Sequence, residues 1–267
     1  MSAHLTTAPG LAPLVFITGA SSGIGQALAV RYAQVGWRLA LVARRTAELQ
    51  AWAEAQAWPA ERFCVYGADV AQPDSIFQAA AACLAQQGLP EVVLASAGIS
   101  VGMDTAYRSD LAVMSDTFAI NNTGLAATFQ PFIQGMRERR SGTLVGVASV
   151  AAIRGLPGHG AYCASKAAVV AYCESLRIEN RVHGLRVVTL LPGYIATPLT
   201  ARNPYPMPFL MPAEAFAEQA FDAIAAGVSY RVIPWQMAVV VKLMRLLPNA
   251  LFDRLFKGRQ RKPRRNS

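Results

Sequence analysis

A glycine-rich turn between a buried strand and a helix constrains this chain more than any other feature. The apolar run Leu14–Ile17 predicts a strand, the turn Thr18–Gly25 (TGASSGIG) follows directly, and a helical pattern then extends through Tyr32. Glycines let the backbone approach a ligand closely, and the free N–H groups and dipole of a helix N-terminus favour a pyrophosphate. A glycine-rich turn can also be simple tight-turn geometry, but in this setting we interpret it as a dinucleotide site.

The second predicted strand, Arg38–Ala43, is followed by Arg44 and Arg45. In many dinucleotide sites an acidic residue at this place accepts hydrogen bonds from the adenosine ribose 2′-hydroxyl. Guanidinium groups suit a 2′-phosphate instead, so the sequence predicts NADP(H) rather than NAD. Arg44 is the stronger candidate because it comes first after the strand; the alternative is that one or both arginines are solvated charges.

Strand runs and helical segments alternate along the rest of the chain. Further strands are expected at 63–66, 91–96, 144–148, 185–191 and 230–235. This alternation, with strands rich in Val and Leu, predicts an α/β fold with a Rossmann-type, doubly wound parallel sheet. A chain of 267 residues, of which 53% are hydrophobic, is long enough for one large domain and short for two.

Small or polar residues stand at strand ends, where such sheets bind ligands. Asp69, next to Val70, is placed either to hydrogen-bond an adenine amino group or to shape the turn. Ala97 and Gly98 follow the fourth strand, where they let the backbone pass close to the cofactor.

The helical pattern of 110–140 contains Gly124 and Pro131, which indicate a kink or break. Asn121 and Asn122 lie near its middle although asparagine is a poor helix former. We expect one of them to face solvent and the other to turn an amide or a freed carbonyl toward the site.

Tyr162 and Lys166 are spaced four residues apart at the start of an Ala-rich helical segment, so they share one helix face. An ammonium beside a phenol favours phenolate and makes the tyrosine a usable general acid for a carbonyl oxygen. Ser149, at the end of the strand run 144–148, is placed to present a hydroxyl to the same oxygen. An ordinary amphipathic helix is the alternative, and the dinucleotide turn favours the catalytic interpretation.

The four cysteines lack Cys-x-x-Cys spacing and lie in apolar or helical stretches, so we expect reduced, packed thiols and no metal site. Residues 1–13 have neither a basic n-region nor an apolar h-region. A cytoplasmic protein is therefore expected.

These motifs together resemble the short-chain dehydrogenase/reductase family, of the single-domain, NADP-preferring type, over about Leu14 to Pro234. The resemblance rests on several motifs in order: Thr18-Gly-x-x-x-Gly-x-Gly25, Asp69-Val70, Asn121-x-x-Gly124, Ser149, Tyr162-x-x-x-Lys166, and Pro192-Gly193 with Thr197. One departure is Ser96-Ala97-Gly98, where the family usually has Asn-Ala-Gly.

The resemblance implies roles for four catalytic residues. Tyr162 would protonate the carbonyl oxygen as NADPH delivers hydride, and Ser149 would orient and polarise that carbonyl. Lys166 would lower the tyrosine pKa and hold the nicotinamide ribose, while Asn121 would position a water that relays protons to the lysine. Thr197 resembles the residue that meets the nicotinamide carboxamide.

The complete predicted cofactor site comprises Gly19, Ser21, Ser22, Gly23, Ile24, Gly25, Arg44, Asp69, Val70, Ala97, Gly98, Tyr162, Lys166, Pro192, Gly193 and Thr197.

The segment Pro198–Pro212 is expected to cover the substrate. It contains five prolines and several large apolar side chains, so a regular helix is not expected. We therefore predict a small apolar carbonyl or alcohol as substrate; the alternative is that these side chains only close the core.

Residues 254–267 hold seven Arg or Lys and no acid, which accounts for most of the net charge of +9. The apolar run 237–247 is too short for a bilayer span. An apolar helix face on 251–256 beside a basic tail predicts peripheral membrane association, with packing on its own domain or on a partner subunit as the equal alternative. Nucleic-acid binding is not expected because the charge is terminal and lacks interleaved aromatics.

The sequence as a whole thus predicts a flexible leader (1–13), a Rossmann-fold oxidoreductase domain (14–234) and an amphipathic, basic C-terminal extension (235–267). The predicted function is NADP-dependent hydride transfer between the nicotinamide and a lipophilic carbonyl or secondary alcohol, in a homo-oligomer (dimer or tetramer). The alternative is a dinucleotide-binding scaffold or sensor that acts through its C-terminal helix.

Overall fold

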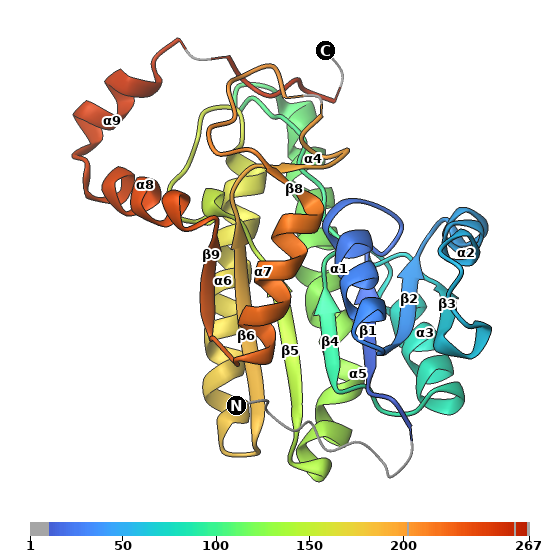
Figure 1. The fold of residues 1–267 in the computed structure, drawn as a ribbon. Helices are drawn as coiled ribbons and strands as arrows, with labels where there is room; N and C mark the ends of the chain where they lie inside the picture. The colour runs from blue at the N-terminus through green and yellow to red at the C-terminus, as the bar shows by residue number, and fades with distance from the viewer. Residues whose placement is uncertain (1–10, 202, 259, 266–267) are drawn as a thin grey trace.

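The computed structural model describes residues 11–201, 203–258 and 260–265 (Figure 1). Residues 1–10 of the predicted leader lie outside the described residues. The end of that leader is held at the sheet, where Arg38 donates its backbone N–H to the Pro13 carbonyl and its Nε–H to the Ala12 carbonyl.

A parallel sheet of seven strands, in the order β3-β2-β1-β4-β5-β6-β9, forms the centre of the molecule. The strands are β1 (Leu14–Thr18), β2 (Arg38–Ala43), β3 (Phe63–Gly67), β4 (Val92–Ala95), β5 (Gly142–Val147), β6 (Leu185–Pro192) and β9 (Tyr230–Ile233). Every predicted strand forms, and the doubly wound parallel fold is confirmed.

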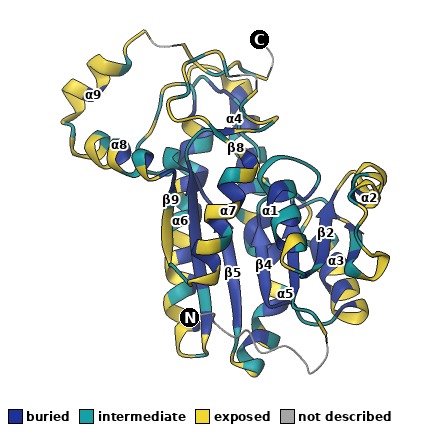
Figure 2. Cartoon of the chain, in the orientation of Figure 1, coloured by how far each residue is buried: buried dark blue, intermediate teal, exposed yellow. Residues whose placement is uncertain are grey.

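Both faces of the sheet are covered by helices, so the inner strands β1, β4 and β5 are dark blue in Figure 2, whereas the edge strand β9 is partly exposed. The helices are α1 (Gly23–Gln34), α2 (Thr46–Ala55), α3 (Pro73–Gln86), α5 (Gly124–Arg139), α6 (Gly160–Arg181) and α7 (Ala213–Ala225). On β1, Val15 and Ile17 face the cluster under α1, α2 and α7, while Leu14 and Phe16 face the cluster under α3, α5 and α6. Because both faces of the strand are buried, successive residues are apolar and the strand sequence is a continuous apolar run.

The helical segment after β4 is interrupted by one π-helical turn. Helix α4 (Leu111–Phe118) runs into the turn Ala119–Thr123, and α5 follows without a loop. The break thus precedes Gly124, whereas Pro131 lies inside α5 and does not end it. A Cβ at Gly124 would lie 2.6 Å from the Val70 carbonyl oxygen, so glycine permits this close approach.

The segment between β6 and α7 is irregular, as its prolines predict. It contains only turns and the short parallel pair β7 (Ile195–Ala196) and β8 (Met211–Pro212) among its described residues. All four cysteines are free thiols, and three of them are buried, which agrees with the expected packing role.

The C-terminal extension packs on its own domain. Helices α8 (Trp235–Leu246) and α9 (Asn249–Phe256) bury Met237, Val241 and Phe252. Arg154 fixes both helices, because its guanidinium donates to the Leu247 carbonyl at 2.7 Å and lies over the Phe252 ring at 3.8 Å.

None of the described helices is long and apolar enough to span a bilayer.

Candidate active site

Ser149, Tyr162 and Lys166 meet at the carboxyl end of the sheet. Ser149 follows β5 and caps the short 3₁₀ turn Val150–Ala152, where its hydroxyl oxygen accepts a hydrogen bond from the Ala151 N–H at 3.1 Å. Tyr162 and Lys166 lie on the first turns of α6, with the lysine Nζ 5.8 Å from the centre of the tyrosine ring. The predicted i,i+4 pairing therefore forms on a helix, next to the strand end that carries the serine.

Burial dominates the protonation of this pair. Burial raises the pKa of Tyr162 to about 12, and a hydrogen bond with Ser149 opposes that rise. Burial also lowers the pKa of Lys166 to about 8, and its Nζ donates to the Val147 carbonyl at 2.8 Å. The tyrosine is therefore a neutral phenol at neutral pH, the protonated form that can act as a general acid. The expectation that Lys166 lowers the tyrosine pKa is wrong for this structure, because burial raises that pKa.

Asn121 lies in the π-helical turn and is 1% exposed. Its side-chain oxygen accepts from the Ile99 N–H at 2.8 Å, and its amide donates to the Ile99 carbonyl at 3.0 Å and to the Ser165 hydroxyl at 2.9 Å. A Cβ at Gly98 would lie 3.2 Å from the Asn121 oxygen and 3.5 Å from the Lys166 Nζ. The Asn121 side-chain oxygen and the Lys166 Nζ thus both lie close to the backbone at Gly98.

Asn122 also points inward, contrary to the expectation that one asparagine faces solvent. Its amide donates to the Ser165 carbonyl at 2.9 Å. Both asparagines therefore tie the π-helical turn to α6.

A cavity of about 420 Å³ extends along the carboxyl ends of β1 to β4. Gly19 adopts a φ of +72°, and a Cβ there would lie 2.8 Å from the Ala97 backbone, so the turn passes closely over the next loop. Gly23 opens α1 at a φ of +58°. The turn therefore fits a pyrophosphate, because the helix N-terminus and its N–H groups face an open cradle.

Eleven of the sixteen predicted cofactor residues line this cavity: Gly19, Ser21, Ser22, Gly23, Ile24, Arg44, Asp69, Val70, Ala97, Gly98 and Thr197. Tyr162 and Gly193 line the neighbouring cavity instead. Lys166, Pro192 and Gly25 line neither. A Cβ at Gly25 would collide with the Gly19 carbonyl, so this glycine allows α1 to pack against the turn.

The two arginines after β2 have different partners. Arg45 pairs with Glu48 of its own helix at 3.0 Å. Arg44 lies 3.9 Å from Asp69 across the cavity and remains 67% exposed. Arg44 is therefore the freer of the two to meet a cofactor phosphate.

A second cavity, of about 320 Å³, begins at Ser149 and Tyr162 and shares Leu199 with the first. Its walls come from the irregular segment after β6 and from α8 and α9. The apolar lining includes Leu156, Pro206, Val240, Met244, Leu255 and Phe256. The C-terminal extension therefore completes this pocket over Ser149 and Tyr162. The sequence predicts such a covering role only for the irregular segment.

The sequence predicts no role for His159 in this pocket, and it predicts Tyr205 only as part of the apolar covering over the substrate. His159 Nδ1 lies 3.1 Å from the Pro157 carbonyl, so it carries the hydrogen, and Nε2 accepts from the Tyr205 hydroxyl at 2.9 Å. Burial lowers the pKa of His159, which favours this neutral ring. The local sequence carries no signal for the pair, because the partners come from separate segments.

Comparison with known proteins agrees with this architecture. The family model for short chain dehydrogenases matches residues 13–206. The chain belongs to the short-chain dehydrogenase family. An uncharacterized oxidoreductase from Myxococcus xanthus is 40% identical over 243 residues, which cover 89% of this chain and 93% of the relative. This short-chain dehydrogenase is therefore an oxidoreductase of a family that binds a nicotinamide cofactor.

Solved structures share its fold. A short chain dehydrogenase/reductase from Burkholderia phymatum in complex with NAD has a TM-score of 0.78 at 24% identity, covering 87% of this chain and 92% of its own. A short chain dehydrogenase from Burkholderia cenocepacia in complex with NADP has a TM-score of 0.79 at 20% identity, covering 92% and 98%. Since one structure holds NAD and the other NADP, the shared fold does not decide between the cofactors.

The buried charge of Lys166 makes a testable contribution to stability. Its pKa falls from 10.5 to about 8 on folding, so the buried ammonium costs stability at pH values below 8, and this cost disappears as pH rises toward 10.5. We expect Lys166→Met to raise Tm at pH 7 and to lose that advantage by pH 10.5. Thermal unfolding across this pH range, with exposed Lys242→Met as control, measures the effect. A lower Tm at pH 7 would mean that the bond to Val147 outweighs the burial cost.

Proposed function

We propose that this short-chain dehydrogenase is an NADP-dependent oxidoreductase that interconverts a lipophilic carbonyl compound and its secondary alcohol. The observation that carries the proposal is that Ser149 and Tyr162 line one end of an apolar pocket that adjoins the dinucleotide cavity at Leu199. A carbonyl carbon held at this junction would lie between the cofactor and the phenol.

The nicotinamide, when bound, supplies or accepts the hydride. Ser149 holds the carbonyl oxygen by a hydrogen bond, and Tyr162 donates its phenolic proton to that oxygen. Lys166 stabilises the phenolate that remains and holds the nicotinamide ribose. Asn121, on the same side of Gly98 as the lysine Nζ, positions a proton-relaying water.

The lipophilic character of the substrate follows from the pocket walls. Hydrocarbon side chains from the irregular segment and from α8 and α9 line much of this pocket. Burial of apolar surface stabilises a bound hydrocarbon by about 25 cal/mol per Å². The polar side chains of the lining, among them His159, Asn203 and Tyr205, come from outside α8 and α9.

Tyr162→Phe tests the catalytic assignment. The variant keeps the ring but lacks the proton donor, so kcat/KM should fall by about 10²–10⁴-fold. The measurement is NADPH oxidation with a panel of hydrophobic ketones, aldehydes and quinones, with circular dichroism as the control for folding. Wild-type activity that survives in the variant would contradict the role of Tyr162.

The alternative, a dinucleotide-binding scaffold or sensor acting through its C-terminal helix, predicts a different outcome. Such a protein would bind NADPH tightly and turn over no member of the panel. The joint presence of Asn121, Ser149, Tyr162 and Lys166 around one point favours the enzyme, because a scaffold would not need all four.

Arg44→Ala tests the cofactor preference. A guanidinium that binds the 2′-phosphate contributes about 1.5–3 kcal/mol, so the KM for NADPH should rise about tenfold or more while the KM for NADH stays unchanged. Arg45→Ala is the matched control, since Arg45 already pairs with Glu48. An equal rise in the KM for NADPH and for NADH would contradict a role for Arg44 in binding the 2′-phosphate.

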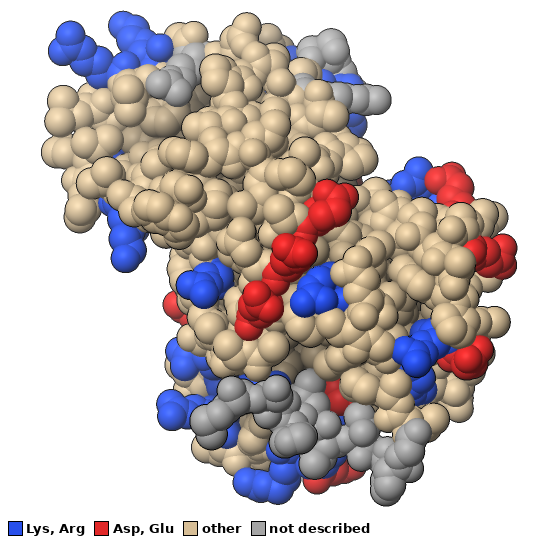
Figure 3. Space-filling view, viewed as in Figure 1, with Lys and Arg blue, Asp and Glu red and all other residues tan. Residues whose placement is uncertain are grey.

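We also propose that the outer face of α8 contacts an anionic membrane surface. Trp235, Val239, Leu243 and Leu246 are between 49% and 79% exposed on this helix. In Figure 3 the lobe formed by α8 and α9 has a mostly neutral surface, with basic side chains at its edge. An apolar face edged by cations suits interfacial binding, and the same face would also suit the homo-oligomer contact.

The double variant Leu243→Asp, Leu246→Asp distinguishes the two roles of this face. Loss of sedimentation with phosphatidylglycerol vesicles would support membrane binding, whereas a smaller mass by light scattering would support a subunit contact. Ile178→Asp on α6, which removes another exposed apolar residue, is the control. If neither property changes, the face serves neither role.

A further inference from the structure

The described end of the basic C-terminal tail lies against its own domain. Residues 260–265, called here the strap, fold back over the carboxyl end of the sheet (Figure 1). Arg264 forms a parallel bridge with Gly102, and a Cβ at Gly102 would collide with the Lys262 and Pro263 carbonyl oxygens. The strap therefore lies directly against the loop that follows β4.

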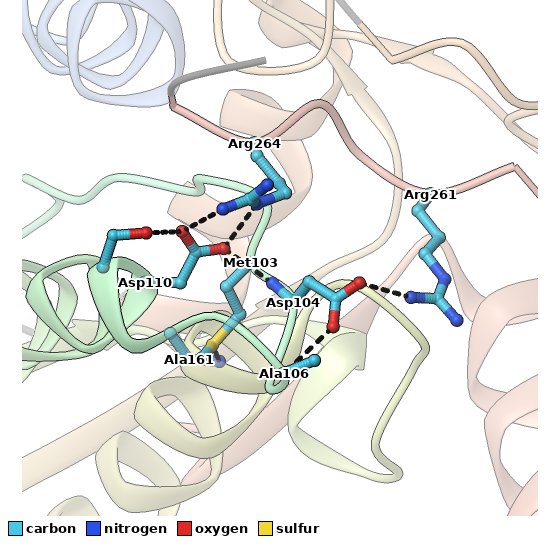
Figure 4. A network of polar contacts seen from close by, with 8 residues as sticks. Met103, Asp104, Ala106, Asp110, Ala161, Arg261 and Arg264 are labelled. Carbon is cyan, nitrogen blue, oxygen red and sulfur yellow. Dashed lines mark hydrogen bonds and ion pairs between the residues drawn. The ribbon is translucent and has the colours of Figure 1, made fainter.

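Ion pairs hold the strap in this position (Figure 4). Arg264 donates two hydrogen bonds to Asp110, at 2.7 and 2.9 Å, and this aspartate is only 3% exposed. Arg261 donates to Asp104 at 3.2 Å. Arg264 binds the buried Asp110 through two hydrogen bonds, so this pair fixes both the position and the register of the strap.

A third pair, between Arg265 and Asp116 at 2.6 Å, lies outside the substrate pocket. Three arginines of the basic tail are thus paired with aspartates of the same chain, and two of them, Arg261 and Arg265, remain partly exposed.

Lys262 differs from its neighbours in the strap because it lines the pocket that holds Ser149 and Tyr162. Its Nζ donates to the Ser100 hydroxyl at 3.1 Å and to the Leu199 carbonyl at 3.3 Å, so it links two other residues of the pocket lining. Its charge also helps to lower the pKa of His159, after burial of that ring.

In the described part of the chain, the Lys262 ammonium donates only to neutral oxygens. Asp104 and Asp110, which follow Ser100 in the sequence, pair with Arg261 and Arg264 instead. Burial lowers the pKa of Lys262. A cation partly removed from water, facing a pocket with mostly hydrocarbon walls, is stabilised by an anion that enters that pocket.

We propose that Lys262 is a specificity-determining residue that binds an anionic group, such as a carboxylate, on an otherwise apolar substrate. This inference rests on the proposed function for the identity of the pocket and narrows its substrate class to amphipathic carbonyl compounds. The hydrocarbon part lies along α8 and α9, and the anionic group meets the strap. The opposing interpretation is that Lys262 only fastens the strap to Ser100 and Leu199.

Binding of octanoate and octan-1-ol to the NADP⁺-saturated protein, measured by calorimetry, separates these interpretations. The two probes share a chain length and differ in charge. We expect octanoate to bind the wild type about tenfold or more tightly than octan-1-ol. Lys262→Gln should remove this preference by weakening octanoate alone, and Lys262→Arg should keep most of it.

Arg265→Gln is the matched control, because it removes one strap charge outside the pocket and should leave both affinities unchanged. Octanoate binding no tighter than octan-1-ol in the wild type would overturn the proposal. Equal loss of affinity for both probes in Lys262→Gln would also overturn it, because this would indicate that Lys262 only fastens the strap. A separate titration of NADP⁺ in which Lys262→Gln lowers the NADP⁺ affinity alone would overturn it too, because the cation would then bind the cofactor.

The binding measurement is independent of turnover. If no carbonyl compound is reduced but the octanoate preference and its dependence on Lys262 hold, the proposed function fails and the anion site stands. If turnover is established and the preference is absent, the enzyme stands and the anion site fails.

Discussion

The side chain of Asn121 is the interaction on which the geometry of the site depends. It joins the loop after β4, through both polar groups of Ile99, to Ser165 of the helix that carries Tyr162 and Lys166. The Asn121 side chain and its bond to Ser165 are buried, so losing that bond would leave unpaired polar groups in the interior. The π-helical turn is what brings this asparagine and its neighbour Asn122 to the same face.

The parallel sheet supplies the second constraint. Because all its strands run in one direction, their carboxyl ends share one edge, and the glycine-rich turn, Ser149 and Leu199 converge there. The dinucleotide cavity and the apolar pocket therefore adjoin. A reaction between cofactor and substrate needs that adjacency more than any single side chain.

Charge is distributed differently in the folded protein than along the chain. The sequence concentrates positive charge near its end, but Arg261, Arg264 and Arg265 are paired with aspartates that lie between β4 and α5. The C-terminal extension is consequently a wall of the pocket as well as a packed pair of helices. Its exposed apolar side chains remain available for other contacts, and so do the exposed Arg254 and Lys257.

Local patterns were sufficient for the strands and for most helices. The strand Arg38–Ala43 has its predicted bounds, and the Tyr162 to Lys166 spacing defines a helix face wherever that helix lies. The helix after Met211–Pro212 was not predicted, and the break in 110–140 was not placed at Ala119–Thr123. A π-helical turn depends on contacts with α6 and with Ile99, which a local pattern does not contain.

By itself the sequence determined the α/β class, the dinucleotide turn and the set of candidate catalytic residues, because these depend on periodicity and short spacings. Only the tertiary structure decided that Lys262 lines the pocket, that His159 pairs with Tyr205 and that three arginines of the basic tail pair with aspartates of the same chain. These contacts join residues that are remote in sequence, and their energies arise only when the folded sheet brings both partners to the same edge.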